Sequence, residues 1–200
     1  YISITSVIKI IVARCRSSIH AILLVSLSVQ EINERVDKRM ALNDVDALTN
    51  RAGDYDLGVQ GFPIDHVKAF ELYSRAADLG SMSAHYSLGN FYRHGKGVPA
   101  NTKKAMHHNT IAAIGGNTQA RNNLGASEAV AGNFPRAMKH FVIAASAGFE
   151  NAMKGLRMGY SEGYISKEDF DNALRAYGEA VDEMNSDQRD VAAKAATIGR

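Results

Sequence analysis

The stretch Ala84–Val98, AHYSLGNFYRHGKGV, decides how this chain folds, because its landmarks recur along the sequence at a constant step. Leu88-Gly89 stands 36 residues after Ala52-Gly53 and 36 residues before Leu124-Gly125. Other positions keep this step: Gly61/Gly97, Pro63/Pro99, Lys68/Lys104, Ala69/Ala105, Ala76/Ala112, Ala77/Ala113, Gly80/Gly116 and Ala84/Ala120. Such a period indicates a small unit that is copied until stacked neighbours bury a shared core.

A shorter copy follows these repeats. The step from Ala105 to Ala137 is only 32 residues, whereas the step from Ala137 to Ala173 is again 36 residues. Four residues are therefore missing between Gly125 and Asn133, and we expect this deletion to lie in a loop.

Each copy carries signals for two helices. Residues that cap helix N-termini well stand four positions before the repeated alanines, at Asp65, Asn101, Asn133 and Asp169. Glycines that can close a helix follow at Gly80, Gly116 and Gly148. These signals predict one helix over about residues 67–79, with a buried stripe of Ala69, Leu72, Tyr73, Ala76 and Ala77. The helix over residues 67–79 is the second of its pair. The first helix of a pair opens near Ala84, Ala120 or Ala152 and ends near Gly95 or Gly163, so the repeat is an antiparallel helix pair.

Two motifs give the sequence a resemblance to a known family. Ala84–Val98 fits Ala-x3-Leu-Gly-x2-Tyr-x2-Gly-x-Gly-Val, and Lys68–Gly80 fits Lys-Ala-x3-Tyr-x2-Ala-Ala-x2-Gly. Both are similar to the Sel-1-like repeat of the tetratricopeptide-like superfamily. The resemblance implies an all-α, right-handed α-solenoid of antiparallel helix pairs, with about 3.5 repeats in this chain. It also implies a concave face that holds peptides or proteins, and no chemistry of its own.

The array is flanked by segments of different character. Residues 1–30 carry a basic stretch followed by an apolar run, which is typical of a targeting segment, a packed helix or a gene-model artefact. Residues 31–43 are predicted to form an N-terminal capping helix, residues 44–184 the repeat array, and residues 185–200 a C-terminal helical cap.

Composition narrows the range of partners. The 23 basic and 21 acidic side chains nearly balance, so the chain lacks the charge expected of a nucleic-acid binder. The single cysteine, Cys15, excludes an intramolecular disulfide and a cysteine-ligated zinc site. We expect a cytoplasmic protein, or one of the secretory pathway or ER lumen if residues 1–30 are a signal sequence. Apart from such a segment, no membrane partner is expected.

The sequence offers no catalytic constellation. Gly89–Gly97 superficially resembles a phosphate-binding loop, but it has the wrong spacing and follows a predicted helix, so an interhelical turn is the better interpretation. His108 and His140 share a repeat position and are expected to face each other, without a third residue to complete a metal site. We therefore predict no catalytic residue, no metal ion and no cofactor.

The remaining prediction is a binding surface. Polar and aromatic side chains on the first helix of each pair are expected to line the concave face: Ser83, Tyr86, Asn90, Arg93, Gln119, Asn122 and Asn123. Such residues suit an extended peptide, whose backbone needs hydrogen-bond partners. The predicted function is a non-enzymatic interaction scaffold or adaptor. The alternative is an accessory part of a ubiquitin ligase, because the chain also resembles proteins with a RING finger ahead of a short array; no such finger is present here.

Overall fold

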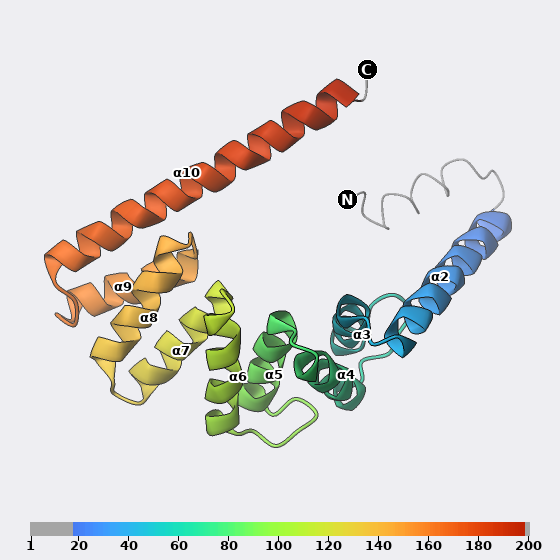
Figure 1. Ribbon diagram of the computed structural model, residues 1–200, viewed down its shortest axis with the longest axis horizontal. Helices are drawn as coiled ribbons and strands as arrows, with labels where there is room; N and C mark the ends of the chain where they lie inside the picture. The colour runs from blue at the N-terminus through green and yellow to red at the C-terminus, as the bar shows by residue number, and fades with distance from the viewer. Residues whose placement is uncertain (1–17, 199–200) are drawn as a thin grey trace. The chain divides into compact units, whose positions relative to one another are not determined.

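The computed structural model describes the backbone of residues 18–198 and the side chains of residues 29–188 (Figure 1). Most of the predicted targeting segment, including Cys15, therefore lies outside the described residues. Within the described range every regular element is an α-helix: α2 (Ser18–Ala41), α3 (Val45–Leu57), α4 (His66–Asp78), α5 (Met82–His94), α6 (Thr102–Ile114), α7 (Thr118–Val130), α8 (Phe134–Ser146), α9 (Glu150–Ser161) and α10 (Lys167–Ile198). The prediction of an all-α repeat fold is confirmed.

The chain divides into two compact units, residues 1–81 and 82–200. In the first unit, α3 packs along α4 and α2 packs against α3. Arg75 of α4 ties this unit together, since its Nη2 donates to the carbonyl of Met40 and its Nε donates to Oδ1 of Asn43, at 2.9 and 3.0 Å. These bonds join α4 to the C-terminal end of α2 and to the turn that follows it.

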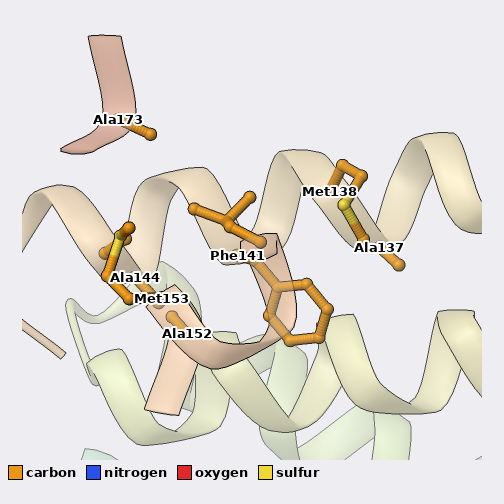
Figure 2. Packing of buried hydrophobic residues seen from close by; sticks show 9 residues of the cluster. Ala137, Met138, Phe141, Ala144, Ala152, Met153 and Ala173 are labelled. Carbon is orange, nitrogen blue, oxygen red and sulfur yellow. The ribbon is translucent and has the colours of Figure 1, made fainter. Parts of the chain in front are cut away.

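The second unit contains the helix pairs α5–α6 and α7–α8, followed by α9 and the long helix α10 (Figure 1). Each helix packs on the next one along the chain, and α10 packs on both α8 and α9. The main core lies in this last part and consists of buried apolar side chains from α8, α9 and α10 (Figure 2). Phe141 and Met153 supply its volume, while Ala137, Ala144 and Ala152 let the helix backbones approach closely.

The second helix of each pair ends in the same way. After α4, the N–H of Gly80 donates to Ala77 and that of Ser81 to Ala76, at 2.8 and 3.0 Å. The same two bonds recur after α6 and after α8, around Gly116 and Gly148. All three glycines have a positive φ, between 77° and 91°, which a residue with a Cβ adopts only under strain. The predicted helix ends are therefore confirmed.

Helices begin directly after three of the four predicted positions, Asp65, Asn101 and Asn133, and the side chain caps the helix at two of them. Asp65 and Asn101 accept a hydrogen bond from the backbone N–H three residues ahead, each at 3.0 Å. Asn133 makes no such bond, because its amide is engaged by Glu128 and Pro135 already occupies the first turn of α8. Asp169 is not the cap of α10. That helix begins three residues earlier, where the hydroxyl of Ser166 accepts from the Asp169 N–H at 3.1 Å.

The predicted deletion lies in a loop. Residues 95–101 connect α5 to α6, whereas only residues 131–133 connect α7 to α8, a difference of four residues. The shorter connection leaves α7 and α8 the same length as α5 and α6, at 13 residues each. The repeat therefore tolerates the deletion without loss of helical packing.

Helix boundaries differ from the predicted flanking segments at both ends of the array. A separate capping helix was expected over residues 31–43, but α2 is continuous from Ser18 to Ala41. The predicted C-terminal helical cap, residues 185–200, is not a separate element, because α10 is one helix of 32 residues from Lys167 to Ile198. The physical reason at the second site is that Met184, which stands where earlier copies have glycine, gives the helix no stop signal.

Candidate functional site

The predicted binding residues lie on two helices of the second unit. Ser83, Tyr86, Asn90 and Arg93 belong to α5, and Gln119, Asn122 and Asn123 belong to α7. Ser83, Arg93 and Gln119 are exposed, while Tyr86, Asn90 and Asn122 are half-buried. We call these seven residues the α5–α7 face.

Three members of the α5–α7 face form one hydrogen-bonded group. The amide nitrogen of Asn123 donates to Oδ1 of Asn90 at 3.1 Å. Nη1 of Arg93 donates to Oδ1 of Asn123 at 3.3 Å. Asn123 is only 7% exposed, so both ends of its amide need partners within the protein. This hydrogen-bonded group therefore links α5 to α7 and sets the direction of the exposed Arg93 guanidinium.

Tyr86 is held in place by the apolar core beneath the face. It packs against the buried cluster formed by Ala112, Ala113, Ala120 and Leu124, which joins α6 to α7. A ring with one side on a core and the other towards solvent presents rigid, amphipathic area at small entropic cost. Ser83, Gln119 and Asn122 show no hydrogen bond to other described residues, so they add polar groups that water satisfies.

The histidines are arranged differently from the prediction. His108 does not pair with His140; its Nδ1 lies 3.0 Å from Nδ1 of His85 on α5, and its ring stacks on Tyr92. The pairing follows from the packing of α5 on α6 within one repeat, which brings these rings closer than the equivalent positions of successive repeats. A hydrogen bond between two imidazole nitrogens holds a single proton.

His140 lies near a buried carboxylate instead. Glu128 is 4% exposed, accepts from Nδ2 of Asn133 at 2.9 Å and pairs with Arg136 at 3.3 Å. Burial lowers the pKa of His140, and the positive charges of Arg121 and Arg136 add to this, while Glu128 opposes it. The group stabilises the short connection between α7 and α8.

The first unit holds a polar group that sequence reasoning missed. Arg51 of α3 is 3% exposed, with its guanidinium 4.2 Å from the Phe62 ring centroid. Its Nη2 donates to Oδ1 of Asn33 at 3.2 Å and lies 3.4 Å from Asp37, both on α2. Arg51 stands 36 residues before Ser87 and 72 before Asn123. That shared register is the signal that could have marked it, since Asn123 also reaches back to an earlier helix.

Two open cavities lie outside the α5–α7 face. One, of about 560 Å³, is bounded by α2, α3 and α4, with Arg51, Tyr55 and Lys68 in its lining. The other, of about 630 Å³, lies between α8 and α10 and is mostly apolar, with Met138, Val142 and Ile165 in its lining. Their sizes are those of ligand pockets in general, but neither gathers a set of groups that could perform a reaction.

The part of the chain that the structure describes meets neither the requirements of a metal site nor those of a membrane-spanning helix. No cluster of three or more histidine, cysteine, aspartate or glutamate side chains there is arranged to hold a metal ion. No described helix combines the length and the apolar character that crossing a bilayer requires.

Stacked antiparallel helix pairs with glycine closures and small interior residues define the class of all-α repeat solenoids. Within that class, the model of the Sel1 repeat matches residues 46–81, 83–117 and 119–149, about half of the chain. The chain belongs to the Sel1 repeat family. Repeats of this family commonly mediate protein–protein interactions and are typically non-catalytic.

Solved structures agree with this assignment. A Sel1 repeat protein from Oxalobacter formigenes is 28% identical, with a TM-score of 0.64 over 82% of this chain and 72% of that one. The protein c5321, a protective antigen present in uropathogenic Escherichia coli strains and displaying an SLR fold, is 27% identical with a TM-score of 0.64. That match covers 75% of this chain but only 33% of c5321. No curated protein matches the chain.

Proposed function

We propose that this chain is a non-enzymatic scaffold that binds an extended segment of a partner protein on the α5–α7 face. The observation that carries the proposal is the hydrogen-bonded group of Asn90, Arg93 and Asn123, which holds polar side chains of two repeats in a fixed arrangement. An ordered polar surface loses less conformational entropy on binding than a mobile one.

The chemistry of the face suits a peptide backbone. An extended peptide exposes amide N–H and C=O groups that must exchange water for protein partners. Asn122 and Gln119 each offer a donor and an acceptor, and Tyr86 offers an anchored ring against which a side chain can pack. We propose that α5 and α7 together hold such a segment.

A displayed library of random 12-residue peptides tests the proposal. Peptides selected on the wild-type chain are expected to bind at least tenfold more weakly to the variant Asn90→Ala/Asn122→Ala. Asn50→Ala is the matched control, because Asn50 is an exposed helical asparagine in the first unit, on α3. Thermal unfolding of each variant checks that it is folded. Failure to select any peptide, or equal binding by the double variant, would overturn the proposal.

The compartment is a further part of the proposal. A chain with a single cysteine gains no intramolecular disulfide from an oxidising environment, which supports a cytoplasmic scaffold. The ubiquitin-ligase alternative stays a prediction, because nothing among the described residues bears on it.

A further inference from the structure

The side chain of Arg93 is oriented by the protein, but its charge is not neutralised by a carboxylate. Arg93 lies in the last turn of α5 and is exposed. Its Nη1 donates to Asn123 at 3.3 Å, and its Nε donates to Nε2 of His94 at 3.3 Å. A guanidinium has five N–H donors, so most of its capacity remains available while its direction is set from within the protein.

Three arginines of the chain have carboxylate partners, whereas Arg75 and Arg121 donate to amide and backbone oxygens within the protein. Arg39 pairs with Asp44, Arg51 lies near Asp37 and Asp54, and Arg136 pairs with Glu128. Among the described residues, Arg93 forms no ion pair, and its hydrogen-bond partners are one amide and one imidazole. A planar guanidinium without an internal acid is well suited to bind a carboxylate from outside, because two parallel N–H groups match its two oxygens.

The charge of the surrounding face points the same way. Of the seven residues that make up the α5–α7 face, Arg93 alone carries a formal charge. Glu128, an acid on α7, is buried and already paired with Arg136. The face is therefore a neutral, hydrogen-bonding surface with one fixed positive charge at the C-terminal end of α5.

We propose that the partner segment carries an aspartate or glutamate side chain that binds Arg93. This inference rests on the proposed function and specifies the partner: an extended peptide whose acidic side chain meets Arg93. Asn123 acts as a positioning residue, since its amide oxygen accepts from Arg93 while its amide nitrogen is anchored on Asn90.

Peptides from the displayed library provide the first test. Because the library is fused through its C-termini to a coat protein, enrichment of aspartate or glutamate reports a side chain and not a terminal carboxylate. The wild-type chain is expected to select sequences with an acid at one fixed position. The same selection on Arg93→Gln should lose that enrichment, whereas Arg157→Gln, which changes an exposed arginine on α9, should keep it.

A double-mutant cycle provides the second test. One selected peptide is synthesised with an amidated C-terminus, together with its counterpart in which the acid is replaced by the corresponding amide. Arg93→Gln should weaken binding of the acidic peptide about fivefold, the upper end of the range for an exposed ion pair, and leave the neutral peptide nearly unchanged. Arg93→Lys should fall between the two because it keeps the charge without the planar fork.

The outcomes separate this inference from the proposed function. Peptides that need Asn90 and Asn122 but show no acidic enrichment would overturn the acidic partner alone. Acidic enrichment that survives Arg93→Gln, or that disappears equally in Arg157→Gln, would also overturn it. Absence of any selected peptide would overturn both, whereas enrichment lost only with Arg93 supports both.

Discussion

The helix pairs α5–α6 and α7–α8 have a glycine at the same repeat position, Gly89 on α5 and Gly125 on α7. A different side chain packs against this glycine in each pair. A Cβ on Gly125 would lie 2.7 Å from the Phe141 ring, and one on Gly89 would lie 2.7 Å from the Asn109 amide. Phe141 and Asn109 occupy the same repeat position on α8 and α6. The glycine therefore sets how closely the helices approach, and the residue opposite decides whether the contact is apolar or polar.

The two contacts should differ in energy. Phe141 is wedged between α7 and α9, since a Cβ on Gly155 of α9 would also lie 2.9 Å from its ring (Figure 2). Asn109 is 1% exposed and its Oδ1 has no hydrogen-bond partner among the described residues. A buried carbonyl without a partner costs free energy that an apolar side chain would not. The same scaffold thus contains one strong contact and one weak one.

Shortening the side chain at the repeat position shared by Phe141 and Asn109 should change the free energy of unfolding the most. Phe141→Ala is expected to lower the free energy of unfolding by about 3–5 kcal/mol, because it removes a buried ring between three helices. Asn109→Ala should cost about 1 kcal/mol or less, since it also removes the unpaired carbonyl. Urea denaturation followed by circular dichroism measures both, and equal losses would contradict the contrast.

The second comparison concerns the loops that connect α5 to α6 and α7 to α8. Asn133→Asp places a carboxylate beside buried Glu128, to which Asn133 now donates, and should lower the free energy of unfolding by about 1–3 kcal/mol at pH 7. Asn101→Asp is the matched change before α6, where the side chain only caps the helix, and should be within about 0.5 kcal/mol of wild type. A similar loss in both variants would show that Glu128 does not depend on Asn133.

The close approach of the helices can be tested with a single methyl group. Gly125→Ala should destabilise the protein by about 1–2 kcal/mol, because overpacking against Phe141 outweighs the gain in helix propensity. Gly178→Ala on α10 is the control, since a Cβ there meets no atom within 4 Å, and it should stabilise by about 1 kcal/mol. Stabilisation by both substitutions would mean that α7 and α8 can move apart freely.

The smallest expected effect is on how the free energy of unfolding depends on pH. Burial and Arg121 lower the pKa of His140 below its ordinary value of 6.5, so the unfolded chain takes up a proton first as the pH falls. Stability should therefore decrease as the pH falls from about 7 through the interval between the ordinary and the lowered pKa. His140→Gln should flatten this part of the stability profile. An unchanged slope in His140→Gln would contradict the assignment.

The caps and glycines show why so much of the fold could be predicted. A cap such as Asp65 acts on an N–H three residues away, and Gly80 acts through its own backbone dihedral, so both signals are local. The errors arose where two signals competed. Asn133 looks like a cap but binds Glu128, and Asp169 looks like a cap but stands behind Ser166, which caps first.

The side-chain contacts of the candidate site were harder to predict from the sequence than the helix ends. The sequence placed its residues on the first helices of two repeats, and the structure brings Asn90, Arg93 and Asn123 into one hydrogen-bonded group. The burial of Arg51 and the pairing of His85 with His108 were not foreseen. Each joins different helices, and a repeat period gives no information about which polar side chains meet.

The sequence by itself determined the repeat, its helix pairs, their closures and the loop that absorbs the deletion, because these depend on short-range hydrogen bonds and on backbone dihedrals. Only the tertiary structure decided which polar groups are buried together and that Arg93 is oriented without an internal acid. Those features depend on contacts between residues some 20 to 30 positions apart, where packing geometry and the cost of burying unpaired polar groups select the partner.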